Sequence, residues 1–539
     1  MQAQSFIDIL SAELDRVDSA LADEQQPPHW IAISAMDHRW LNISAANGAT
    51  ITPQRFHTRG ADLDIRVGTP QLDQTHKIRD AGWFDSDNKE SFGLPLGDDP
   101  AAIQLAIWRA ADDAYRQARK RLLKVQANLA VKVASSDDSA DFSSAPVQID
   151  LREPAVLSVD EFEWQDRLRI ASKRVTQSAH VLDSNLSLSA QAETRFLVTT
   201  DGTRLSLPRT HFRVSVFLRT TADDGMDITV YEAFDAVSAR DLPDQATLNA
   251  AVDDAAARLL ALRAAPVVEP TIAPAILKGR AAAVFFHEVL GHRIEGHRQK
   301  DDDEGQTFTD KIGELVLPKF ISVIDDPTLA SLSGTDLNGH YSHDDEGVAA
   351  QRVVVVDAGV LRNFLTSRSP IAGFPTSNGH GRRQMGHHVV SRQGNLLVEA
   401  SASVSAERLR SMLLQEVRRQ GKPYGFIFED ITGGFTFTGR VTPNAFAVQP
   451  VGIVRVFADG RPDELVRGAD LIGTPLTTFQ QILAASDETQ VFNGSCGAES
   501  GWVPVSAAAP DLLIGEVEVQ RSEKAHDRPP LLPPPGLLK

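Results

Sequence analysis

Apolar residues recur at two different spacings along the first part of the chain, and the two spacings predict different elements. Near the N-terminus an apolar stripe repeats every three to four residues, which is typical of an amphipathic helix: Phe6, Leu10, Leu14, Val17 and Leu21. From Trp30 to Gly48 apolar and polar residues alternate, as they do in half-buried strands. The helical spacing then returns from about Ala101 to Lys132. We therefore expect a helix, strands and a second, long helix.

The composition and the apolar pattern of the sequence change twice, and these changes predict three domains. Residues 134–144 are small and polar, which favours a linker or a long loop. Strand-like runs on both sides of the turn Asp201–Arg204 follow, and an alanine-rich helix is expected around residues 246–264. We interpret residues 1–145 as an N-terminal α/β domain and residues 146–268 as a central α/β domain.

Beyond Pro270 the chain is rich in strands and studded with glycine. Runs such as QRVVVVDAGVLRNFL and FAVQPVGIVRVFADG predict a large β-rich domain over residues 269–539. The proline-rich tail RPPLLPPPGLLK is expected to lie extended on a surface. The fold class predicted for the whole chain is α+β, with an N-terminal α/β region followed by this β-rich domain.

Charge and composition narrow the classes of function. The chain has 539 residues and a formal net charge of −18, which argues against binding to nucleic acid or to an anionic membrane. No apolar run approaches the roughly 18 residues of a membrane-spanning helix. The N-terminus lacks the basic and apolar regions of a signal peptide, so we expect a cytoplasmic protein. Cys496 is the single cysteine, and internal disulfides are therefore excluded.

One stretch carries residues suited to metal chemistry: FFHEVLGHRIEGH, from Phe285 to His297. Imidazoles bind zinc, and a neighbouring carboxylate such as Glu288 can take a proton from water. However, His287 and His292 are five residues apart, so on a regular α-helix they diverge by roughly 140°. Glu288, His292 and Glu295 share a face instead, which leaves open a carboxylate-type metal cluster or a salt-bridged surface. The apolar residues that precede His287 favour a buried helix.

Four segments in the same order resemble the TldD/PmbA family of metallopeptidases. They are FFHEVLGHRIEGH, the Asp-Asp-Glu-Gly region within residues 342–368, the NGHGRR loop at Asn378–Arg383, and the Cys-Gly segment within residues 493–519. The resemblance implies that His287, His292 and Cys496 bind zinc and that Glu288 is the general base. Because all of these residues are present, the chain resembles the active, TldD-like branch. The metal-binding helix then lies at the start of the β-rich domain.

The resemblance also implies a substrate and partners. We expect hydrolysis of short or unfolded peptides inside a chamber enclosed by a dimer, either a homodimer or a heterodimer with a PmbA-like paralogue. His380 and Arg382, in the glycine-rich loop, are candidates for binding the peptide, although pairing with acidic residues explains the arginine equally well. A peptide-binding or regulatory subunit with little hydrolysis is the alternative function. Catalysis by Cys496 as a nucleophile is a weaker one.

The five-residue spacing makes a prediction about the backbone. If His287 and His292 bind one zinc ion, the helix must be unwound or widened between them. A π-type bulge, with about 4.4 residues per turn, would return both imidazoles to one face. Gly291, directly before His292, tolerates altered dihedral angles or close packing. We therefore expect the helical hydrogen-bond pattern to break within Glu288–Ile294.

Overall fold

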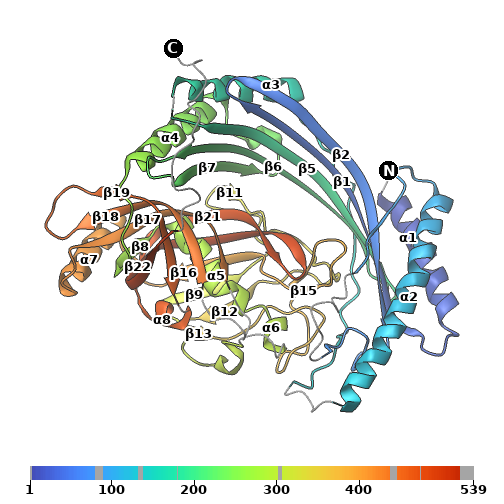
Figure 1. Cartoon of the computed structure of the whole chain (residues 1–539). Coiled ribbons are helices and arrows are strands. Elements are labelled where there is room, and N and C mark those ends of the chain that lie inside the picture. The colour runs from blue at the N-terminus through green and yellow to red at the C-terminus, as the bar shows by residue number, and fades with distance from the viewer. Residues whose placement is uncertain are drawn as a thin grey trace.

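The computed structural model describes residues 3–78, 89–131, 137–178, 180–300, 306–436, 446–473 and 475–522. The proline-rich tail and part of the linker predicted at residues 134–144 lie outside these ranges. Two large sheets and their helices make up the described chain, in which the first sheet arches over the second (Figure 1). The predicted α+β fold class is confirmed.

The first sheet contains seven strands among the described residues, in the order β3-β2-β1-β5-β6-β4, with β7 paired to β6. Its strands are β1 (Pro28–Ala46), β2 (Ala49–Val67), β3 (Phe92–Gly93), β4 (Ile149–Leu151), β5 (Asp183–Thr199), β6 (Arg204–Thr221) and β7 (Asp227–Ala236). The hairpin β1–β2 turns at Asn47 and Gly48, both with positive φ. Antiparallel pairing of β1 with β5 crosses the boundary predicted at residue 145, so strands from both predicted N-terminal ranges form one sheet.

Helices cover one face of this sheet. They are α1 (Ala3–Leu21), α2 (Pro100–Val131), α3 (Glu161–Ser172) and α4 (Gln245–Ala264), with the short turns η1 (Lys173–Gln177) and η2 (Ala239–Asp241). The apolar stripe of α1 is buried as predicted, together with α2 and one end of the sheet. The other pair, α3 and α4, covers the opposite end of the sheet. All four lie on the outer side of the arch, so the inner face of the sheet is turned toward the C-terminal region (Figure 1).

The second sheet contains eleven strands of the described residues, in the order β13-β12-β9-β16-β22-β20-β18-β17-β8 with two lateral strands. Its strands are β8 (Thr271–Leu277), β9 (Ile321–Asp325), β12 (Val353–Asp357), β13 (Val360–Leu361), β16 (Asn395–Ala400), β17 (Tyr424–Thr436), β18 (Phe446–Phe457), β19 (Glu464–Val466), β20 (Ala469–Gly473), β21 (Ile482–Ala498) and β22 (Gly501–Arg521). Because β8 also pairs with β22, the strands β22-β20-β18-β17-β8 close into a ring.

The remaining elements of this region are short, except for two helices. They are α5 (Gly279–Val289), η3 (Gly291–Arg293), α6 (His297–Lys300), η4 (Thr309–Lys311), α7 (Ala406–Arg419), α8 (Pro475–Gln480), and the two-stranded pairs β10 (Ser331–Leu332) with β11 (Thr335–Asp336) and β14 (Gly381–Arg382) with β15 (Val390–Ser391). Helix α5 packs against β22, β17 and β21 and is buried on almost every side. Among the described residues, no helix combines the length and apolar character that crossing a membrane requires.

Candidate metal centre

His287 and His292 come from two different turns of the backbone. His287 lies in the last turn of α5, which ends at Val289, and His292 lies in the 3₁₀ turn η3 that follows. Between them the bond from Leu290 N–H to Phe286 O is the last of the α-helix, and Arg293 N–H then bonds Leu290 O at 2.8 Å. The predicted break is therefore confirmed. The π-type bulge is wrong, because the backbone tightens into a 3₁₀ turn after the helix ends instead of widening within it.

Gly291 lets another segment approach this turn closely. A β-carbon at Gly291 would lie 1.9 Å from Oε1 of Gln393, far closer than any real contact. The Gln393 side chain is buried, and its Nε2 donates to the carbonyl oxygen of His287 at 3.4 Å. Of the two roles expected for Gly291, the structure shows close packing.

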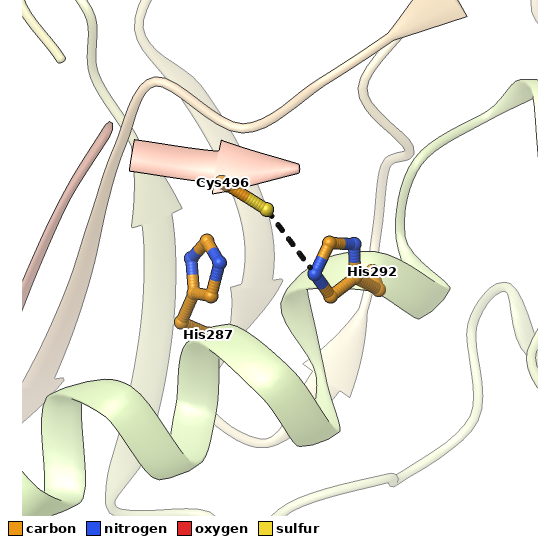
Figure 2. A group of neighbouring side chains, drawn as sticks. All are labelled: His287, His292 and Cys496. Carbon is orange, nitrogen blue, oxygen red and sulfur yellow. Dashed lines mark hydrogen bonds between the residues drawn. The ribbon is translucent and has the colours of Figure 1, made fainter. Parts of the chain in front are cut away.

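The third member of the group arrives from the end of β21. Cys496 extends from that strand above the two histidines, and the three side chains converge (Figure 2). Cys496 Sγ lies 3.4 Å from His292 Nε2, and the ligand atoms of all three residues lie within 4.8 Å of one another. The two imidazole rings meet at an interplanar angle of 75°, with centroids 5.2 Å apart. All three side chains are buried.

The charges of the three side chains depend on each other. Burial opposes ionisation of the Cys496 thiol, but the adjacent imidazoles of His292 and His287 hold its pKa well below the usual value. Burial likewise opposes a charge on His292, yet the Cys496 thiolate and Glu295 raise the pKa of that imidazole well above its usual value. The pocket therefore favours the thiolate form of cysteine, which is the form that binds metals.

An ion-pair network holds the second histidine and the cysteine in place. His292 Nδ1 lies 3.2 Å from Oε2 of the buried Glu295, so this nitrogen carries the proton and Nε2 faces the sulfur. Glu295 also accepts from Arg298 Nε at 3.0 Å. Arg392 lies 3.3 Å from Glu295 and donates to the carbonyl oxygen of Cys496 at 2.8 Å. One buried arginine thus connects the two sides of the site.

The donor set fits a zinc ion. Two imidazoles and one thiolate are common zinc ligands, and in a tetrahedral site they would lie about 3.3 to 3.6 Å apart. The separation of Cys496 from His292 already matches this spacing. His287 Nδ1 is buried and has no hydrogen-bond partner among the described residues. Glu288 lies beside the group, with its Oε2 3.8 Å from His292 Nε2. No other group of three such ligands is found in the described part of the chain.

The two residues predicted to bind the peptide occupy different positions. His380 is completely buried, and its Nε2 lies 3.2 Å from Asp325 Oδ1. Arg382 lines a cavity between the two sheets, and its guanidinium stacks on the ring of Tyr341. Of the other histidines, His340 Nδ1 lies 2.9 Å from the carbonyl oxygen of Pro327.

The C-terminal region is similar in sequence to known proteins. Residues 270–521 match the family model of the PmbA/TldA metallopeptidase C-terminal domain. The C-terminal region of the chain is therefore similar in sequence to the TldD/PmbA metallopeptidases. It is 29% identical over 255 residues to a metalloprotease TldD homolog of Haemophilus influenzae, covering 46% of this chain and 48% of that protein. It is 21% identical to a zinc metalloprotease TldD homolog of Saccharolobus solfataricus, covering 46% and 51% of the two chains.

The fold of the whole chain also has a solved counterpart. The crystal structure of TldE from Thermococcus kodakarensis aligns with a TM-score of 0.61 at 14% identity, over 95% of this chain and 100% of that one. This likeness shows the fold. The sequence matches to the two TldD homologs span about half the length of each relative, and for the Haemophilus protein this is 48%.

The sequence did not indicate two residues that lie at this site. Arg392 and Gln393 occur together in the segment SRQGN, between β15 and β16. Both are buried, although arginine and glutamine are usually exposed. Nothing in the local pattern distinguishes them, because their partners lie about a hundred residues away on both sides of the chain.

Proposed function

We propose that this protein is a zinc-dependent peptidase that hydrolyses short or unfolded peptides. The observation that carries this proposal is the convergence of His287, His292 and Cys496 beside the Glu288 carboxylate. Two imidazoles and one thiolate would hold the ion and leave a fourth position for water or substrate. The presence of the complete set favours the active, TldD-like branch of the family.

The residues around the ion have separate roles in this proposal. His287, His292 and Cys496 would bind zinc, which supplies a Lewis acid that acidifies water and polarises a carbonyl group. Glu295 fixes the tautomer of His292 by accepting from Nδ1, so that Nε2 is available as a ligand. Arg392 holds the backbone of Cys496 against the same glutamate.

Glu288 is the base. Its carboxylate lies within 4 Å of the ligand nitrogen of His292, close enough to reach a water molecule in the open fourth position. It would accept the proton of the attacking water and pass it to the nitrogen of the leaving amine.

The resemblance to the family supports the other parts of the proposal, which are the dimer, the enclosed chamber and the preference for unfolded peptides. A dimer, formed with a second copy or with a PmbA-like paralogue, would enclose the site in a chamber in the cytoplasm. The name TldE of the solved counterpart supports a partner of this kind. An enclosed site admits an extended chain more readily than a folded domain, which accounts for the expected preference for unfolded peptides.

The test combines metal analysis with turnover of an unstructured peptide. The purified protein should contain about one zinc per chain and cleave the peptide, and a chelator should abolish cleavage until zinc is restored. Cys496→Ala should lose both zinc and activity, whereas Ser495→Ala, on the exposed neighbouring residue, should retain both. A zinc-loaded protein that binds the peptide without cleaving it would instead favour the regulatory subunit.

A further inference from the structure

A cavity of about 160 Å³ lies between the two sheets, next to the candidate metal centre. This volume is several times the roughly 30 Å³ that a water molecule occupies in the liquid. One wall is the inner face of the first sheet, and the other is formed by β14, β22 and the loop around Asn338 and Tyr341. The cavity is therefore built from both halves of the molecule.

Strand alternation turns charged residues toward this cavity. In β6, the even-numbered residues from Phe212 to Leu218 pack under the outer helices. Side chains alternate along a strand, so the odd-numbered Arg209 belongs to the inner face. In β5 the same alternation places Glu193 and Arg195 on the inner face, and all three side chains line the cavity. Arg382, from β14, lines it from the opposite side.

Two of the arginines in the walls have carboxylate partners. Arg195 forms an ion pair with Asp345, and Arg383 forms a two-pronged ion pair with Asp62, with Nη2 to Oδ1 at 2.7 Å. These two guanidinium groups are neutralised within the fold.

The other two, Arg209 and Arg382, have no carboxylate within salt-bridge distance among the described residues. Arg209 donates from Nη2 to Asn338, and Arg382 donates from Nη1 to the carbonyl oxygen of Gln393 at 2.5 Å. A guanidinium has five N–H donors, so each keeps donors for a further acceptor. A buried charge without a counter-charge is costly. A ligand anion is the natural counter-charge in a cavity.

The electrostatics of the cavity agree with this interpretation. Burial, together with the neighbouring positive charges of Arg195 and Arg382, lowers the pKa of Arg209 despite Glu193. Burial and neighbouring arginines also lower the pKa of Arg382. Asp344 does not compensate for them, because burial and the adjacent Glu346 raise its pKa well above the usual value. The walls therefore hold excess positive charge.

The cavity shares a strand with the metal centre. Val503, Trp502 and Pro504 of β22 line the cavity, and Val503 is the register partner of Cys496. Val503 and Cys496 also belong to one small buried cluster. A group bound in the cavity thus lies across one strand pair from the sulfur of the candidate centre.

We propose that Arg209 and Arg382 form an anion subsite that binds a carboxylate group of the peptide substrate. This inference rests on the proposed peptidase function and specifies its substrate class. A planar guanidinium can bind a carboxylate through two parallel hydrogen bonds, and two such groups on opposite walls would fix the position of the peptide. The carboxylate comes either from the C-terminus of the peptide or from an aspartate or glutamate side chain.

The test measures peptide binding, so it does not depend on turnover. The zinc-loaded Glu288→Gln protein is titrated calorimetrically with an unstructured peptide whose side chains are all neutral. The peptide is used with a free C-terminal carboxylate and with a C-terminal amide, and each form is also made with one glutamate. Loss of the relevant carboxylate should weaken binding about 10- to 100-fold. Weaker binding of the amidated peptide, with no gain from an added glutamate, assigns the subsite to the C-terminus. Tighter binding of the glutamate peptides, with no effect of amidation, assigns it to an acidic side chain.

Substitutions then locate the subsite. Arg209→Gln and Arg382→Gln should weaken binding of the peptide that carries the carboxylate. Binding of the uncharged peptide should stay nearly unchanged, so that the preference for the carboxylate disappears. Arg219→Gln is the control, because Arg219 lies on the same strand, is exposed and does not line the cavity. The proposal would be overturned if the Glu288→Gln protein, with both arginines in place, bound the free-acid, amidated and glutamate-containing peptides equally well. This comparison needs no arginine variant. Equal weakening of charged and uncharged peptides by Arg209→Gln would also overturn it.

Discussion

His292 and Cys496 are 204 residues apart in the chain, yet sulfur and nitrogen lie 3.4 Å from each other in the fold. A local pattern cannot predict such a contact. The resemblance to a family supplied the pairing of the histidines with the cysteine, and in the structure these three residues lie together. The residues that hold the ligands, Glu295 and Arg392, act through buried contacts whose geometry exists only in the folded chain.

At the residue scale, a substitution of Glu288 distinguishes catalysis from binding most clearly. Glu288→Gln keeps the size of the side chain but cannot accept a proton, so we expect turnover to fall by about 100- to 10,000-fold. Zinc content and peptide binding should remain near those of the unsubstituted protein. Steady-state hydrolysis and metal analysis measure these quantities, with the exposed Glu314→Gln as the control. Near-normal hydrolysis would assign the base to another residue.

At the element scale, the end of α5 determines whether the two histidines meet. The sequence predicted that the helix must break, because five residues of regular helix would separate the imidazoles. It did not predict how the helix breaks. A π-bulge and a helix end followed by a 3₁₀ turn can both bring the rings together. In the structure the 3₁₀ turn packs against Gln393, which lies outside the local sequence.

This packing predicts the effect of adding one methyl group. Gly291→Ala places a β-carbon where the Gln393 side chain lies, so the turn that carries His292 must move. Overpacking of this kind costs about 1 to 3 kcal/mol of stability, and we expect weaker zinc binding as well. Shortening the neighbour in the double variant Gly291→Ala/Gln393→Ala should restore much of both. Gly97→Ala, which meets nothing within 4 Å, is the control. A single variant with unchanged zinc affinity would contradict the packing role.

At the scale of the whole molecule, the arch of the first sheet is fastened to the C-terminal region by buried charges. Asp62 of β2 is completely buried and accepts from Arg383 and from the backbone N–H of Gly386 at 3.1 Å. The sequence predicted the helices α1, α2 and α4 and strands such as β1, β5 and β6. It did not predict that β1 and β5 pair across the chain, because strand pairing at this separation depends on tertiary packing.

The Asp62 contact predicts a pH dependence of stability. Burial opposes its ionisation, but Arg383 and Lys89 lower the pKa of Asp62 to about 2. A folded-state pKa below the unfolded value stabilises the protein above about pH 4, by about 2 kcal/mol, and this stabilisation is lost as the pH falls toward 2. Asp62→Asn should therefore unfold at a lower temperature at pH 7, with a smaller difference at pH 3. Thermal unfolding measures this, with the exposed Asp112→Asn as the control. A difference that is the same at both pH values would contradict the assignment.

The proposed chamber predicts selection against folded substrates. An extended peptide can pass a narrow opening, whereas a stable domain must first unfold, so we expect much slower cleavage of the domain than of a peptide with the same cleaved sequence. Comparing one domain with a destabilised variant of itself isolates this effect. Equal rates for the stable and the destabilised domain would argue against an enclosed site.

X-ray absorption at the zinc edge tests the central claim most directly. If His287, His292 and Cys496 hold one zinc ion, the spectrum of the zinc-loaded protein should show one sulfur at about 2.3 Å and nitrogen or oxygen ligands at about 2.0 Å. Because Cys496 is the single cysteine of the chain, no other thiolate can supply this sulfur. A spectrum of the unsubstituted protein with only nitrogen and oxygen ligands, at one bound zinc per chain, would contradict the three-residue metal centre.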